Sequence, residues 1–230
     1  MGMMANLAAI AYVFLLLAGV PALAFHTARR GRLREVPRLA LYFSAVVSQW
    51  VLALLGLPIV LVTARDRVAA TFHLLPLSIL VVWTTLLAAI SLAGLGFCLL
   101  LERRGWWPKE PELVELLIPQ TPREKLWALC IVTPTAALCE EFLYRGYLLT
   151  QLGHWFHSAS WAWGITSLAF GLAHMYQGWS GVLRAALLGA LLALPVMRLG
   201  SLYPAIFAHA LIDALALVWL GPKFLRQEST

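Results

Sequence analysis

Charged residues are scarce in this sequence. Asp, Glu, Lys and Arg together make up 12% of the 230 residues, whereas hydrophobic residues make up 61%. Soluble domains have about a quarter charged and about half apolar residues, so the composition excludes an ordinary soluble protein. The mean hydropathy of +0.81 supports the same conclusion. The composition therefore predicts a multi-pass integral membrane protein, which we expect in the cell membrane.

Cysteine is also scarce, and its pattern excludes a disulfide framework. Cys98, Cys130 and Cys139 are odd in number, form no CxxC pair and all lie within apolar runs. They are typical of small buried hydrophobic residues. Two familiar protease signatures are missing as well, because there is no HExxH zinc motif and no GxSxG sequence around Ser167. Any hydrolytic chemistry must therefore use a different set of residues.

Seven apolar runs have the composition of membrane helices. A helix needs about 20 apolar residues to cross roughly 30 Å of hydrocarbon. The runs are Ala5–Phe25, Leu39–Val62, Leu74–Leu101, Leu126–Leu152, Ser160–Tyr176, Gly181–Leu199 and Leu202–Leu220. The fifth and the seventh are short, so the count could differ by one. We predict an all-α fold, a polytopic membrane bundle of about seven helices with eight as the alternative, in a single domain over residues 1–230.

Basic and aromatic residues indicate how these helices lie in the bilayer. Cytoplasmic loops carry an excess of Lys and Arg, so the basic stretches at 29–38 and 103–125 predict an outside N-terminus and a cytoplasmic C-terminus. Tryptophans gather at both interfaces of membrane proteins. We expect an inner belt of Trp106, Trp107, Trp127, Trp179 and Trp219 and an outer belt of Trp155, Trp161 and Trp163. The net charge of +6 reflects this orientation, so the expected partner is the lipid bilayer and not nucleic acid.

Ionisable residues interrupt the fourth apolar run. Such groups cost roughly several kcal/mol each at membrane depth, so they are rare and usually functional. Glu141 and Arg145 are four residues apart, which places them on one helical face, and we interpret them as a structural pair. Glu140 is turned about 100° from Glu141 and is predicted to point elsewhere. A carboxylate without a cation one turn away is suited to taking a proton from water.

The fifth and seventh runs each carry a histidine. Phe170 and His174 are four residues apart on the fifth run, and His209 and Asp213 repeat that spacing on the seventh. An Asp one turn from a His can accept the imidazole N–H and orient the ring. Counted along the helices, Glu140 and His174 lie at similar depths below the turn that they share. The spacing therefore predicts that the three polar stations meet in one buried site.

These three motifs, in this order on apolar helices, resemble the CPBP family. The residues that carry the resemblance are Glu140-Glu141-x-x-x-Arg145, Phe170-x-x-x-His174 and His209-x-x-x-Asp213. The family includes the type II CAAX prenyl endopeptidases and bacterial homologues linked to bacteriocin processing or self-immunity, also called the ABI family. The resemblance covers about residues 120–220. It implies a helical intramembrane bundle with a polar cavity open to the membrane, in which this segment is the catalytic core.

The resemblance also implies roles for the motif residues. Glu140 and His174 would activate the attacking water, and His209 with the residue four positions later would stabilise the oxyanion or complete the polar site. That last residue is commonly Asn in the prenyl endopeptidases, whereas here it is Asp213. An ionised Asp cannot donate a hydrogen bond to an oxyanion. Asp213 must therefore be protonated, orient His209 or bind a metal. The residues expected in supporting roles are Glu141, Arg145 and Phe170.

The sequence leaves the use of a metal open. Glu140, His174 and His209 contain the nitrogen and oxygen donors that a catalytic zinc site could use. The same residues fit a metal-free mechanism in which a glutamate activates water. We therefore expect either zinc or no metal at this site.

The motifs predict an intramembrane endopeptidase of the CAAX or CPBP type, either glutamate-dependent or metal-dependent. It would hydrolyse a peptide bond of a membrane-associated protein or peptide, and no residue identifies a prenylated substrate. One alternative is a non-catalytic immunity or binding protein on the same scaffold, which would keep its phenotype after Glu140→Gln. Another is a proton-coupled transporter that uses the Glu and His groups as a relay, although no repeat pair is evident.

Overall fold

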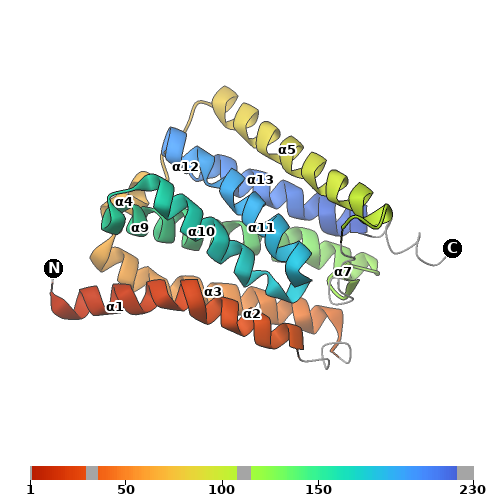
Figure 1. Cartoon of the computed structure of the whole chain (residues 1–230), viewed down its shortest axis with the longest axis horizontal. Helices are drawn as coiled ribbons and strands as arrows, with labels where there is room; N and C mark the ends of the chain where they lie inside the picture. The colour runs from red at the N-terminus through yellow and green to blue at the C-terminus, as the bar shows by residue number, and fades with distance from the viewer. Residues whose placement is uncertain (1, 30–35, 108–114, 222–230) are drawn as a thin grey trace.

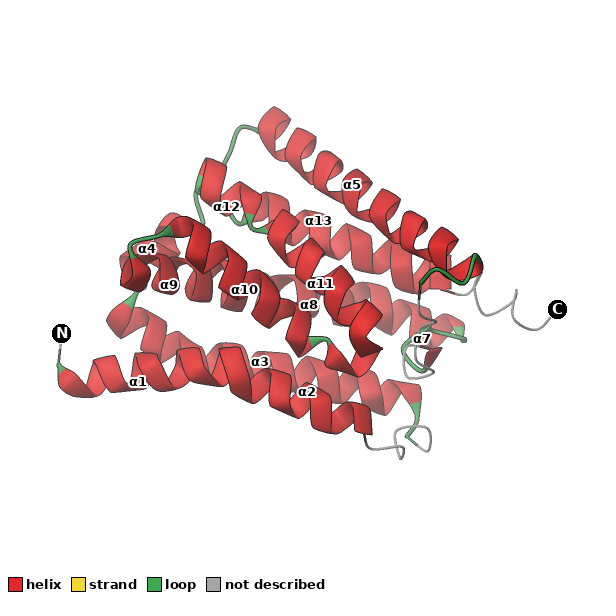
Figure 2. Cartoon of the chain, viewed as in Figure 1, coloured by secondary structure: helices red, strands yellow, loops and turns green. Residues whose placement is uncertain are grey.

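The computed structural model of the chain describes residues 2–29, 36–107 and 115–221. These residues are mostly helical and include no strand (Figure 2), so the predicted all-α fold is confirmed. Most of the basic stretch at 29–38, and part of the one at 103–125, lies outside the described residues.

The chain forms a succession of helices, several of which continue into one another. The first part comprises α1 (Met3–Phe14), the π-helical η1 (Leu15–Gly19), α2 (Val20–Arg29), α3 (Arg38–Thr63), α4 (Arg65–Ala70) and α5 (Leu77–Arg103). The second part comprises α7 (Pro122–Trp127), η3 (Ala128–Val132), α8 (Thr133–Glu140), η4 (Glu141–Leu148), α9 (Leu149–Phe156), α10 (Ala159–Ala173), η5 (Met175–Gln177), α11 (Gly178–Leu192), α12 (Leu194–Leu199), α13 (Tyr203–Ala214) and η6 (Leu215–Leu220). The segments from α7 to α9 form one continuous helix, which carries the first motif.

Five helices among the described residues are long and apolar enough to cross a membrane. They are Met3–Arg29, Arg38–Thr63, Leu77–Arg103, Pro122–Phe156 and Met175–Leu199. Tyr203–Trp219 is a shorter apolar helix, and α10 has only 15 residues. The polytopic membrane bundle is therefore confirmed. Two of the seven predicted spans are shorter than the length that crosses a bilayer, and they are the two whose apolar runs are short in the sequence.

The continuous helix Pro122–Phe156 occupies the middle of the bundle (Figure 1). Its α8 segment packs against α3 on one side and against α13 on the other. α10 packs against α9, α11 and α2, while α5 packs against α13 at the edge of the bundle. The helix with the two glutamates is therefore enclosed by the helices that carry the two histidine motifs.

The apolar residues divide between a buried interior and an outer surface. Tyr147 and Leu148 of the central helix are fully buried and belong to the same cluster as Leu16 of η1. On the outside, Val62 of α3 is 64% exposed and Leu77 of α5 is 74% exposed. Large apolar side chains this exposed on long helices need lipid as their solvent.

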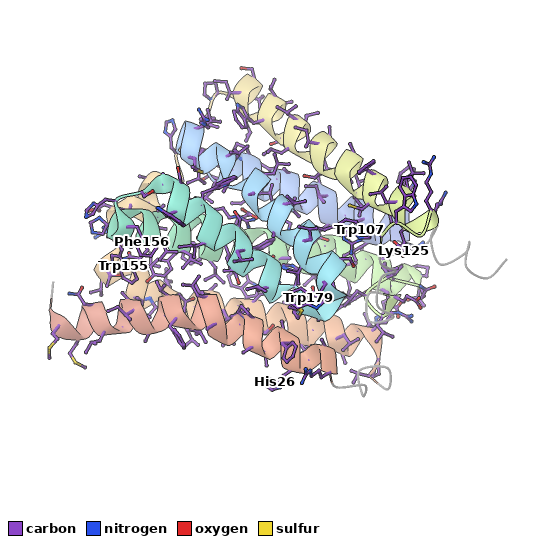
Figure 3. The ribbon with its side chains drawn as sticks, viewed as in Figure 1. His26, Trp107, Lys125, Trp155, Phe156 and Trp179 are labelled. Atoms are coloured by element: carbon purple, nitrogen blue, oxygen red, sulfur yellow. The ribbon has the colours of Figure 1, made fainter. Side chains whose placement is uncertain are left out.

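Aromatic residues lie at both ends of the bundle. Figure 3 shows Trp155 and Phe156 at the end where α9 finishes, and Trp107 and Trp179 at the opposite end, with Lys125. This separation agrees with the assignment of Trp155 to one predicted belt and of Trp107 and Trp179 to the other. The helix axes therefore run from one aromatic belt to the other.

Candidate active site

The two adjacent glutamates lie where the central helix changes its winding. α8 ends at Glu140, and the π-helix η4 continues from Glu141 to Leu148. π-Helical segments are rare and occur frequently at functional sites. The wider turn still keeps Glu141 and Arg145 together, because Arg145 Nη1 donates to Glu141 Oε1 over 2.8 Å. The pairing predicted from their spacing is confirmed.

This ion pair is buried and belongs to a packed unit. The side chains of Arg145 and Glu141 are 2% and 0% exposed. The guanidinium also lies over the ring of Phe170, with Cζ 4.1 Å from the ring centroid, which is a cation–π contact. Phe170 meets the ring of Tyr144 edge to face at 5.2 Å. The three supporting residues predicted from the sequence therefore contact one another directly or through one neighbour.

His209 of α13 lies between the two glutamates. Its Nδ1 is 2.8 Å from Glu141 Oε1, and its Nε2 is 3.9 Å from Glu140 Oε2. An ionised carboxylate only accepts hydrogen bonds, so Nδ1 carries the proton and donates it to Glu141. Both glutamates therefore face one imidazole from different sides. The ring from α13 lies within reach of both carboxylates, which approach different nitrogens of it.

Asp213 lies on the other side of the imidazole from Glu141. Its Oδ2 is 3.6 Å from His209 Nε2, which is too long for a hydrogen bond, and its side chain is 29% exposed. The spacing predicts that Asp213 orients the imidazole, whereas the carboxylate that accepts the orienting hydrogen bond is that of Glu141. The carboxyl group of Asp213 therefore faces Nε2 of His209 without a hydrogen bond between them.

His174 lies at the break between two helices. α10 ends one residue before it, and α11 begins at Gly178, whose φ of +73° is in the region that favours glycine. The Nδ1 atom of His174 is 2.8 Å from the carbonyl oxygen of Phe170, one of the carbonyls that a helix end leaves unpaired. Nδ1 therefore donates, and the lone pair is on Nε2. Among the described residues, no hydrogen bond or ion pair joins His174 to Glu140.

Phe170 links the two histidines by packing. Its ring centroid is 4.7 Å from that of His174 and 6.2 Å from that of His209. The structure thus brings Glu140, His209 and Asp213 into one cluster of charges, and it connects His174 to that cluster through an aromatic ring.

One residue of the site lies outside the three motifs. Gln49 of α3 donates from Nε2 to Glu140 Oε1 over 2.7 Å. The two residues are 91 positions apart in the chain, so no spacing rule connects them. A signal was nevertheless present, because Gln49 is the only amide side chain in the apolar run Leu39–Val62. Polar side chains inside such runs are rare enough to mark functional positions.

Several buried polar atoms around Glu140 have no hydrogen-bond partner in the described structure. They include the Oε2 atoms of Glu140 and Glu141, Nη2 of Arg145 and the hydroxyl of Tyr144. Buried polar groups are ordinarily hydrogen-bonded, either to protein or to water. The surroundings of Glu140 are therefore polar enough to accept water.

The candidate metal ligands do not fit a metal ion in this arrangement. Among the described residues, no group of three or more His, Cys, Asp or Glu side chains is placed to hold one ion. Glu140, His174 and His209 are therefore not gathered around one point that an ion could occupy in this arrangement.

Residues 122–215 match the family described as Rce1-like, type II CAAX prenyl endopeptidase Rce1-like. The matched segment runs from the start of α7 into η6 and contains all three motifs. The resemblance to CPBP proteases is confirmed for this segment. The family implies a CAAX-type intramembrane protease, which acts on a protein substrate in a membrane. No curated protein and no solved structure matches the chain.

Proposed function

We propose that this chain, whose residues 122–215 match the Rce1-like CAAX prenyl endopeptidases, is an intramembrane endopeptidase of the cell membrane. It hydrolyses a peptide bond of a membrane-associated protein or peptide with a water that Glu140 and His174 activate. The observation that carries this proposal is the pair of carboxylates on the His209 imidazole, inside an apolar bundle. A purely structural ion pair needs only Glu141 and Arg145. The additional acid, Glu140, whose side chain is 17% exposed, therefore calls for a chemical role.

Glu140 is the general base of this mechanism. Its Oε1 accepts from Gln49, and its Oε2 has no hydrogen-bond partner among the described residues. Water gives a proton to Oε2 while its oxygen forms a bond to the carbonyl carbon of the substrate. His174 assists by accepting a hydrogen bond from the same water at Nε2, because its Nδ1 already donates to Phe170.

His209 stabilises the charge that forms during the attack. Negative charge develops on the carbonyl oxygen, and a donor aimed at that oxygen lowers the barrier. As an imidazolium, His209 has an N–H on each nitrogen, one of which donates to Glu141. The other, on Nε2, is available to the oxyanion. Asp213 lies 3.6 Å from that nitrogen and balances the positive charge of the ring, so it need not donate a hydrogen bond.

The second half of the reaction returns Glu140 to its starting state. The tetrahedral intermediate breaks its C–N bond, and the proton held by Glu140 passes to the leaving nitrogen. The products are a new carboxyl group and an amine, and the carboxylate of Glu140 is ionised again. One residue thus acts first as a base and then as an acid.

The proposal is tested by peptide cleavage in membranes that contain equal amounts of each variant. The probe is a fluorophore–quencher peptide with a prenylated C-terminal CAAX sequence. The same peptide without the prenyl group shows whether cleavage depends on prenylation. Glu140→Ala and His174→Ala are each expected to lower cleavage by roughly a hundredfold or more. Glu115→Ala is the control, because Glu115 is exposed. Full cleavage by the Glu140→Ala variant would show that the chemistry lies elsewhere.

A further inference from the structure

Gln49 lies near the middle of α3, which packs against α8. Its neighbours Val47, Trp50 and Val51 are 42%, 40% and 48% exposed on the lipid-facing surface. An amide at this depth costs free energy unless its hydrogen bonds are satisfied. The contact with Glu140 over 2.7 Å supplies a partner for it.

The chemistry of the two groups fixes the direction of this hydrogen bond. A glutamine amide has two N–H donors and one oxygen acceptor, whereas an ionised carboxylate only accepts. Gln49 therefore presents Nε2, and not its oxygen, to Glu140. A hydrogen bond to an ionised group is also stronger than one between neutral groups.

This contact makes the two oxygens of Glu140 different. Oε1 is held by Gln49, while Oε2 faces His209 Nε2 at 3.9 Å and has no hydrogen-bond partner among the described residues. The terminal torsion of a glutamate is broad, so a carboxylate without an anchor can rotate and exchange its oxygens. A donor on one oxygen prevents that exchange.

We propose that Gln49 is a positioning residue, which holds Oε1 of Glu140 so that Oε2 takes the proton from water. This inference rests on the proposed function and adds a residue to it. Gln49 lies outside the matched segment 122–215. The part of the chain before that segment therefore contributes to catalysis, and α3 must be docked on α8 for full activity.

The first test separates positioning from substrate binding. Purified Gln49→Leu protein is assayed with the prenylated CAAX peptide, and rates are normalised to the amount of folded protein. Loss of a hydrogen bond to a charged group corresponds to roughly a ten- to hundredfold fall in kcat, with KM within about twofold of its normal value. Ser48→Ala is the matched control, because the Ser48 hydroxyl donates to the carbonyl of Ala45 on its own helix. A normal kcat in the Gln49→Leu protein overturns the inference.

The second test does not depend on activity. Thermal midpoints are measured for Gln49→Leu, Glu140→Leu and the double variant. If the two side chains bond to each other, the thermal midpoint of the double variant falls by less than the sum of the two single decreases. Additive losses overturn the inference, whether or not a substrate has been found.

The two tests also distinguish this inference from the proposed function. Cleavage that Glu140→Ala abolishes and Gln49→Leu leaves intact contradicts the role of Gln49 alone. Cleavage that survives Glu140→Ala contradicts the proposed function, and the thermal cycle then decides whether Gln49 holds Glu140.

Discussion

Gly171 allows α10 to approach α11 closely. A Cβ atom at this position would lie 2.6 Å from the carbonyl oxygen of Val182 and 2.7 Å from the Cβ of Ala186, both on α11. Neither atom is the end of a flexible side chain, so an alanine here must push the two helices apart. Gly164 on the same helix has nothing within 4 Å of the corresponding position. The two glycines therefore form a matched pair for substitution.

The expected magnitude comes from comparing the two variants. Replacing glycine by alanine inside a helix stabilises the folded state by about 0.5–1 kcal/mol, and this applies equally to Gly164→Ala and Gly171→Ala. Overpacking costs about 1–3 kcal/mol, and only Gly171→Ala incurs that cost. The unfolding midpoint of Gly171→Ala should therefore be lower than that of Gly164→Ala by roughly 2–12 °C, at about 2–4 °C per kcal/mol.

The assay is thermal unfolding of both purified variants in the same detergent, followed by tryptophan fluorescence. Gly171→Ala should also lower peptide cleavage, because a displaced α10 disturbs the contact between Phe170 and Arg145 and shifts His174. Equal midpoints for the two variants would refute the reasoning, since they would mean that α10 and α11 have room for a methyl group.

Two further substitutions probe the charges of the site. Glu141→Gln leaves the guanidinium of Arg145 without its anionic partner, and breaking a buried pair costs about 3–5 kcal/mol. The unfolding midpoint of Glu141→Gln should fall by roughly 6–20 °C. The control Glu115→Gln changes an exposed residue, so its midpoint should stay close to that of the unchanged protein. Similar midpoints for the two variants would show that the ion pair adds no stability. Asp213→Asn should lower kcat less than tenfold, because Asp213 is partly exposed and too far from His209 for a hydrogen bond. Complete loss of cleavage in the Asp213→Asn protein would show that this carboxylate takes part directly.

Local spacing was enough to predict several features of the site. Glu141 and Arg145 are one turn apart, so any helical winding that keeps residues four apart on one face brings them together. Phe170 and His174 likewise meet one turn apart, at the C-terminal end of α10. The apolar runs predicted the helices for the same reason, because length and hydropathy are properties of a continuous segment.

Contacts between distant segments could not be predicted in this way. The hydrogen bond from His209 to Glu141 joins residues 68 positions apart, and the one from Gln49 to Glu140 joins residues 91 positions apart. Both depend on how α13 and α3 dock on the central helix, which a single sequence does not specify. The π-helical winding after Glu140 was also missed, because it depends on the packing around the helix and has no composition signal of its own.

The 15 residues of α10 have a consequence for the surrounding lipid. At 1.5 Å per residue this helix is about 22 Å long, roughly 8 Å less than the usual hydrocarbon thickness. Trp161 and Leu168 on its outer side are 71% and 56% exposed, so acyl chains contact it directly. Lipids beside a short helix compress to match it. The bilayer should therefore be thinned next to His174, which in the proposed mechanism would shorten the distance that water and a hydrophilic peptide travel to reach Glu140.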